Sequence, residues 1–324
     1  MLEGEINMRD LDDFAKFVVD QLVSPSNDFI QRKSDDLFLT NRKEKDANVN
    51  LSVKLEDDMK STKIEKTNTR AHEYPILFYH LLRTYRSKNK VNDDLEEMGL
   101  GNLKQWLQRN EIIEPGCLIA QRVKTRNEYK FLTEAPKGKN IEKINHTELE
   151  KFTRKIFQDW GGIRFNDDTS YYERVSSTDF EMDIEIIAHR SKFYAHTHPE
   201  DRYIYDSRVS LTLLVFANLW KKKDPDSFPL VEGNSGDYKQ LKEIFENERK
   251  ESLKNAKEFY DDYCNLIAKV SNELIKKLRV DKELEEEELK LFGQLVEMAL
   301  FSFGKKIKKE EKIDFDSLFL PHNG

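Results

Sequence analysis

The chain has 324 residues, 35% of them charged and 38% apolar, which is enough for one large domain or two ordinary ones. No apolar run approaches the roughly 18–20 residues that cross a membrane, so we expect a soluble protein without a membrane partner. The net charge of −7 argues against a general nucleic-acid coat, although it leaves room for a local basic cleft.

Two features predict a cytoplasmic location. Residues 1–5 are acidic and polar, unlike a secretory signal. The two cysteines, Cys117 and Cys264, lie far apart in the sequence and have no ligand spacing, so we expect them to be reduced and buried.

The N-terminal part of the chain predicts one helix, one strand and a long polar stretch. Apolar residues recur at helical spacing over 8–23. Residues 26–70 are polar and charged, except that Val49, Leu51, Val53 and Leu55 alternate with polar residues and predict a strand. We therefore expect a mainly α protein with a small mixed α/β N-terminal part.

Helical periodicity returns in the middle of the chain. It predicts helices over 74–85, 102–109, 147–158 and 179–190. The tripeptide Glu114-Pro115-Gly116 predicts a turn, and the mixed character of 118–132 predicts a hairpin.

The stretch 191–209 is the most informative of the chain. A helix is predicted to begin at Asp206 and Ser207, because the residues after them are apolar at helical spacing. A carboxylate at such a start accepts hydrogen bonds from free backbone N–H groups, so a helix cap is the simplest interpretation of Asp206. Lys192 and Arg208 nearby would instead create a charge environment of the kind that shifts pKa values and supports catalysis.

The C-terminal third predicts further long helices, one through Tyr263 and Leu274 and one through Phe292 and Phe303. The acidic run 283–288 between them is interpreted as a solvated helix face, and Gly304 as the cap of the last helix. We expect three parts, spanning residues 1–70, 71–305 and 306–324.

Metal and cofactor chemistry are weakly supported. His189, His196 and His198 cluster in the sequence, but no further ligand stands at a regular spacing from them. Phosphate-binding loops and the Gly-x-Ser-x-Gly elbow are absent from the sequence. No metal and no cofactor is therefore predicted.

A family resemblance follows from the string Ser191-Lys192 … Pro199 … Ile204-Tyr205-Asp206-Ser207-Arg208-Val209 and the apolar helix behind it. The string resembles part of the helix-hairpin-helix DNA glycosylase superfamily, in particular bacterial 8-oxoguanine-glycosylase-like proteins. Residues 295–301 also resemble the last core helix of such proteins. The resemblance covers residues 70–305 and is specific only within the string.

The resemblance implies a helix-hairpin-helix glycosylase-like architecture and excision of a damaged or modified base from DNA. It assigns the catalytic carboxylate to Asp206 and a possible amine nucleophile to Lys192. Residues expected to contact the extruded base are Trp160, Tyr194, Tyr203, Tyr205 and Arg208. Residues expected to contact the DNA backbone are Arg190, Arg202, Lys221, Lys222 and Lys223.

Two other hypotheses stay open. In one, the chain is a catalytically silent helical module that binds DNA or protein, and Asp206 is only a cap. In the other, it is an unrelated helical scaffold, which the net negative charge favours. A monomer is expected, and these residues do not separate DNA repair from phage defence.

Overall fold

The computed structural model of the protein describes residues 8–23, 51–53, 77–85, 94–133, 146–157, 184–220, 228–231 and 256–309. These residues are mainly α-helical, which confirms the predicted class. The helices are α1 (Met8–Val23), α4 (Leu77–Thr84), α5 (Gly101–Arg109), α6 (Glu114–Thr133), α7 (His146–Lys155), α9 (Ile184–Thr197), α10 (Ser207–Trp220), α12 (Ala256–Leu278), α13 (Glu286–Lys290) and α14 (Phe292–Lys306), with a 3₁₀ turn, η4 (Val280–Lys282).

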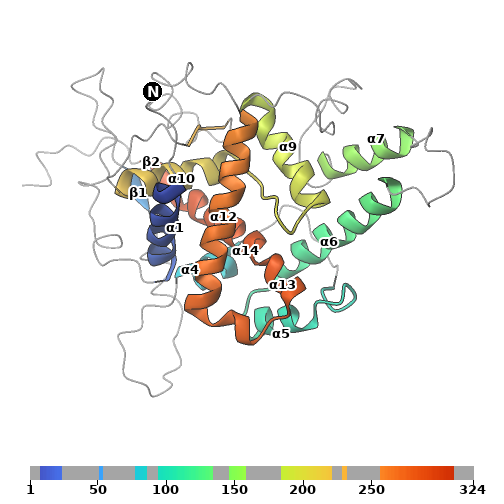
Figure 1. Cartoon of the computed structure of the whole chain (residues 1–324), viewed down its shortest axis with the longest axis horizontal. Coiled ribbons are helices and arrows are strands. Elements are labelled where there is room, and N and C mark those ends of the chain that lie inside the picture. The colour runs from blue at the N-terminus through green and yellow to red at the C-terminus, as the bar shows by residue number, and fades with distance from the viewer. Residues whose placement is uncertain are drawn as a thin grey trace, which may run out of the picture.

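Helix α14 lies at the centre of the fold, with α4, α10, α12 and α6 packed around it (Figure 1). Leu295, Val296, Ala299 and Phe303 on this helix have no exposed surface. A helix that is apolar on nearly every side is stable only when neighbours cover all of it. Helix α14 therefore organises the described core. None of the described helices is long and apolar enough to span a membrane.

The N-terminal helix α1 belongs to the same core. Its predicted apolar face, which includes Phe14 and Val18, is buried against α12, α4 and α10. The predicted strand is present as β1 (Leu51–Val53), which pairs antiparallel with β2 (Ile307–Lys309) at the other end of the chain. The wider mixed α/β part and the three-part division of the chain stay predictions.

A second, smaller cluster lies where α6, α7 and α9 meet. It is formed by Phe152, Ile156, Phe157, Ile186 and Phe193. Figure 1 places α6 and α7 next to each other at the edge of the molecule, away from α1. Helices α6 and α9 carry side chains in both this cluster and the main core, so these two helices join them.

Three sequence predictions about this region are wrong. Residues 114–116 do not form a turn and 118–132 do not form a hairpin, because both belong to the 20-residue helix α6. Pro115 is tolerated in the first turn of α6, where a helix does not need the missing N–H. The helix expected at 179–190 is present from Ile184, but its predicted end is wrong because α9 continues through Thr197, and residues 179–183 lie outside the described residues.

Two further corrections concern the C-terminal third. Gly304 is not a cap, because it lies inside α14. Glu288 is not solvated, since it is 2% exposed and its carboxylate accepts hydrogen bonds from the backbone N–H groups of Leu103 and Glu285, each at 2.9 Å. One buried carboxylate thus binds the first turns of both α5 and α13, where the helix dipoles favour negative charge.

Candidate functional site

Residues 199–206, which lie between α9 and α10, form a connecting segment whose backbone is held by side chains from other helices. Gln294 of α14 donates its Nε2 hydrogens to the carbonyl oxygens of Pro199 (2.6 Å) and Arg202 (2.9 Å). The hydroxyls of Tyr260 and Tyr263, on α12, donate to the next two carbonyls, those of residues 203 and 204, at 3.0 and 2.7 Å. These bonds replace the regular hydrogen bonding that the segment lacks.

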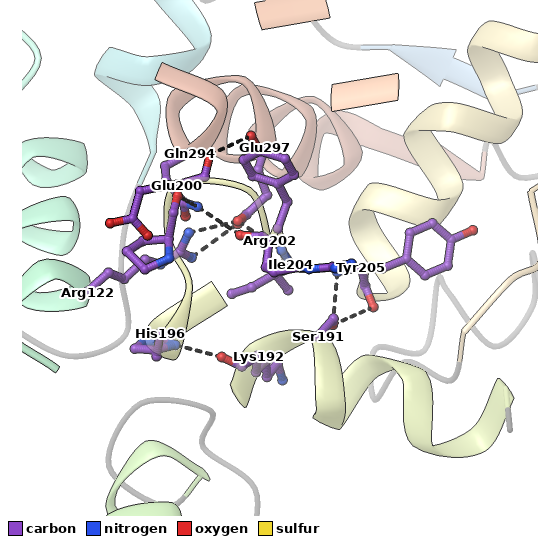
Figure 2. Close-up of polar contacts among 12 residues, drawn as sticks. Arg122, Ser191, Lys192, His196, Glu200, Arg202, Ile204, Tyr205, Gln294 and Glu297 are labelled. Carbon is purple, nitrogen blue, oxygen red and sulfur yellow. Dashed lines mark hydrogen bonds and ion pairs between the residues drawn. The ribbon is translucent and has the colours of Figure 1, made fainter. Parts of the chain in front are cut away.

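A buried ion pair supports the same segment (Figure 2). Arg122 of α6 and Glu297 of α14 are joined by two hydrogen bonds of 2.8 and 3.2 Å, and both residues are at most 3% exposed. Glu297 also accepts the backbone N–H of Ile204 at 3.0 Å. Burial raises the pKa of Glu297, while Arg122 and the Ile204 N–H act in the opposite direction.

The tyrosines of the segment are structural. Tyr203 and Tyr205 are 2% and 0% exposed. The hydroxyl of Tyr205 donates to the carbonyl of Pro229 at 2.7 Å, and its backbone N–H donates to the Ser191 hydroxyl at 3.0 Å. Their burial contradicts the expectation that these two rings contact a substrate.

Asp206 ends the segment and begins α10. Its Oδ1 accepts the backbone N–H groups of Arg208 (3.0 Å) and Val209 (3.1 Å), which is the geometry of a helix cap. The side chain is partly exposed. Its second oxygen, Oδ2, accepts no hydrogen bond from the residues that the structure describes. One oxygen of the carboxylate is therefore fixed by the cap, and the other has no hydrogen-bond donor among the described residues.

Beside Asp206 lies a group of aromatic and cationic side chains, Tyr85, Arg208, Phe301 and Lys305, which we term the Phe301 cluster. The Lys305 Nζ lies 4.6 Å from the centre of the Phe301 ring, and the Arg208 Cζ lies 5.9 Å from it. The rings of Tyr85 and Phe301 are 5.7 Å apart. Arg208 is two residues after Asp206 and its backbone N–H donates to the Asp206 carboxylate, so the carboxylate and the cluster are neighbours.

Sequence reasoning found only Arg208 among the members of this cluster. Phe301 and Lys305 are four positions apart, so they share one face of the last turns of α14. That spacing is the one local signal that would have indicated them, because Tyr85 comes from a distant part of the chain.

Gly304 allows the start of α10 to approach α14. A Cβ atom at Gly304 would lie 2.3 Å from the carbonyl oxygen of Arg208. The Thr212 hydroxyl lies between the same helices, 2.8 Å from the carbonyl oxygen of Leu300 and 2.9 Å from that of Arg208. The absence of a side chain at Gly304 thus sets the distance between Asp206, Arg208 and the Phe301 cluster.

Replacing Gly304 by alanine is therefore expected to lower the free energy of unfolding by about 1–3 kcal/mol, because the rigid backbone of α10 must move to admit the methyl group. Urea unfolding would measure the loss. Gly101→Ala is the matched control, since nothing lies within 4 Å of its Cβ position, and it is expected to be neutral or stabilising by up to about 1 kcal/mol. Equal effects of the two substitutions would contradict the role given to Gly304.

Lys192 lies inside α9 and not in a hairpin. Its backbone carbonyl accepts the Nδ1–H of His196 at 2.8 Å. Burial lowers the pKa of His189, and the Lys192 charge acts in the same direction. Figure 2 shows its side chain pointing away from the Arg122–Glu297 pair. Among the described residues, no hydrogen bond or ion pair joins Lys192 to Asp206.

The arginines expected on the DNA backbone are engaged within the protein. Arg190 is 2% exposed and donates to the Tyr194 hydroxyl at 3.1 Å, so it is not placed to contact phosphate. Arg202 forms an ion pair with Asp261 and lies against the ring of Tyr260. Tyr194 is partly exposed. The predicted residues Trp160, Lys221, Lys222 and Lys223 lie outside the described residues.

The histidines do not gather around a metal site. Within the described ranges, no three His, Cys, Asp or Glu side chains are grouped so that they could hold a metal ion. His196 is buried inside α9, and burial lowers its pKa from 6.5 to about 3, with the positive charges of Arg122 and Lys192 acting in the same direction. Both cysteines are free thiols, with Cys264 buried and Cys117 partly exposed, contrary to the expectation that both are buried.

The pKa of His196 predicts a loss of stability in acid. The folded state binds the proton more weakly than the unfolded state, so the stabilisation is complete above pH 6.5 and is lost as the pH falls toward 3. Each pH unit in that window is expected to cost about 1.4 kcal/mol of unfolding free energy. The free energy of unfolding should therefore change less between pH 7.5 and pH 5 in the His196→Leu variant than in the wild type. An unchanged difference would show that other groups cause the acid lability.

Comparisons of the chain with protein-family models, with curated proteins and with solved structures found no match.

Proposed function

We propose that this protein is a DNA glycosylase-like enzyme that excises a damaged or modified base, with Asp206 as its catalytic carboxylate. The observation that carries the proposal is the hydrogen bonding of that carboxylate. Two backbone N–H groups hold Oδ1 at the start of α10, and Oδ2 accepts no hydrogen bond from the described residues. The same residues form the part of the sequence that resembles helix-hairpin-helix glycosylases.

The proposed reaction uses this geometry directly. Excision breaks the bond between C1′ of the sugar and the base nitrogen. The base departs with the bonding electrons, and positive charge develops on the sugar. A carboxylate oxygen stabilises that charge. The same oxygen accepts a proton from the attacking water as the new C1′–O bond forms.

Water is the nucleophile in this proposal. Lys192 lies within α9, and no described hydrogen bond or ion pair links it to Asp206. We therefore propose base excision without cleavage of the strand. The proposal also includes a helix-hairpin-helix-like arrangement around Asp206, a cytoplasmic location, DNA as the partner and no cofactor.

The test is incubation of the full-length protein with DNA duplexes that carry a panel of damaged and modified bases, scored for abasic sites. Base release from at least one duplex, with an intact strand and without trapping by borohydride, supports the proposal. Trapping of the protein on DNA would instead assign the attack to an amine, and Lys192→Gln would identify it. No release from any duplex would contradict the enzymatic function.

A second candidate is a catalytically silent helical module that binds DNA or protein. It is favoured by a specific observation, because Asp206 has the complete geometry of a helix cap. The burial of Tyr203 and Tyr205 is also explained by packing alone. This alternative expects DNA binding or protein binding without base release.

A further inference from the structure

The Phe301 cluster concentrates positive charge at one place on the surface. Arg208 and Lys305 come from different helices, yet both cations lie within 6 Å of the same ring. Both side chains, and Phe301 itself, are partly exposed. The guanidinium of Arg208 forms no ion pair and no hydrogen bond with any described residue. Each of these cations attracts an anion, and their contact with one ring places both on the same part of the surface.

We infer that Arg208 and Lys305 bind one phosphodiester group of a DNA strand, and that the ring of Phe301 holds the two cations in position for it. This inference rests on the proposed function, because it names the part of the substrate that contacts the protein beside Asp206. Neither cation belongs to the basic runs that the sequence suggested as backbone contacts.

The chemistry of the two cations fits a phosphodiester. The planar guanidinium of Arg208 can donate two parallel hydrogen bonds to phosphate oxygens, whereas the Lys305 ammonium acts as a point charge. An aromatic ring beneath a cation contributes about 0.5–1 kcal/mol at an exposed site and limits the positions that the cation samples. The Phe301 ring therefore orders both side chains before a ligand arrives.

The position of the cluster gives the phosphate a role. Arg208 is two residues after Asp206, and its backbone N–H is bound to the Asp206 carboxylate. A phosphate held by Arg208 would fix a sugar close to the available Oδ2 of Asp206. The cations would also offset the repulsion between that carboxylate and the DNA backbone. The cluster is thus a positioning site for the nucleotide on which Asp206 acts.

The experiment measures binding of a fluorescein-labelled 20-nucleotide duplex to the full-length protein by anisotropy at several salt concentrations. Arg208→Gln with Lys305→Gln removes two phosphate-binding charges, so the slope of log affinity against log salt should become shallower by about 1.8. At the lowest salt concentration, affinity should fall about tenfold or more. Phe301→Leu keeps both charges, so it should weaken binding about two- to fivefold while leaving the slope unchanged.

The matched control is Arg109→Gln with Lys276→Gln, which removes two cations whose side chains are 63% and 70% exposed on other helices. It should leave slope and affinity as in the wild type. Thermal unfolding checks that each variant is folded. Inorganic phosphate and AMP serve as competitors, and neither should displace the duplex at concentrations below the millimolar range if a DNA strand is the ligand.

The outcomes separate this inference from the proposed function. If the wild type excises a base but the Arg208–Lys305 double variant keeps the wild-type slope and affinity, the phosphate site is overturned, while the proposed enzymatic function is supported. If the double variant flattens the slope but no base is released from any duplex, the phosphate site stands and the enzymatic function fails. Displacement of the duplex by micromolar AMP would overturn DNA as the ligand of the cluster.

Discussion

Asp206→Asn is expected to lower the rate of base excision by at least about 10²–10³-fold while leaving the fold intact, because the substitution removes the charge that stabilises the sugar cation. Asparagine caps a helix about as well as aspartate, so the hydrogen bonds to Arg208 and Val209 are retained. Single-turnover excision and thermal unfolding measured on the same preparation would test both halves of the expectation.

Asp201→Asn is the control, since Asp201 is an exposed aspartate in the same connecting segment. It should excise at the wild-type rate. Asp206→Ala should be inactive as well and should also lose about 1 kcal/mol of stability, because alanine cannot cap α10. A folded Asp206→Asn variant with full activity would leave Asp206 as a cap alone and favour the catalytically silent module.

The largest effect on stability is expected from Glu297→Ala. The substitution leaves the guanidinium of Arg122 buried without its carboxylate and leaves the N–H of Ile204 without its acceptor. Removing one partner of a buried ion pair costs about 3–5 kcal/mol. Urea unfolding at neutral pH would measure this loss.

Two variants make that test specific. Glu286→Ala removes an ion-pair partner whose side chain is 86% exposed, and it should change stability by less than about 0.5 kcal/mol. Combining Glu297→Leu with Arg122→Leu should recover part of the loss, because no buried charge is then left alone. A cost below about 1 kcal/mol for Glu297→Ala would mean that water reaches Arg122 in the folded protein.

The fold was predictable where one face of a helix is apolar. Helices α1, α4, α5, α12 and α14 were all expected from their periodicity. Helix α6 was missed because its buried side carries Gln121, Arg122 and Thr125, which break the apolar pattern. Of these three, Arg122 is buried together with a distant partner, Glu297, and the local sequence holds no sign of that partner.

The candidate site was predictable only in its local part. The position of Asp206 at a helix start follows from the residues just after it, and the structure has α10 beginning at Ser207. The residues that hold the connecting segment could not be inferred, because Gln294 lies 92 positions after Arg202. The Phe301 cluster likewise draws on Tyr85, which follows α4, and on α10 and α14, and these parts meet only in the folded protein.

The way in which the connecting segment is held has a consequence for its evolution. Its partners on α9, α12 and α14 bind backbone atoms, which every amino acid except proline supplies alike. Exchange of an exposed side chain such as Asp201 leaves these bonds in place. Insertion or deletion of one residue would shift every later carbonyl away from its donor and rotate Asp206 out of the first turn of α10. Relatives of this protein should therefore vary the composition of 199–206 while keeping its length constant.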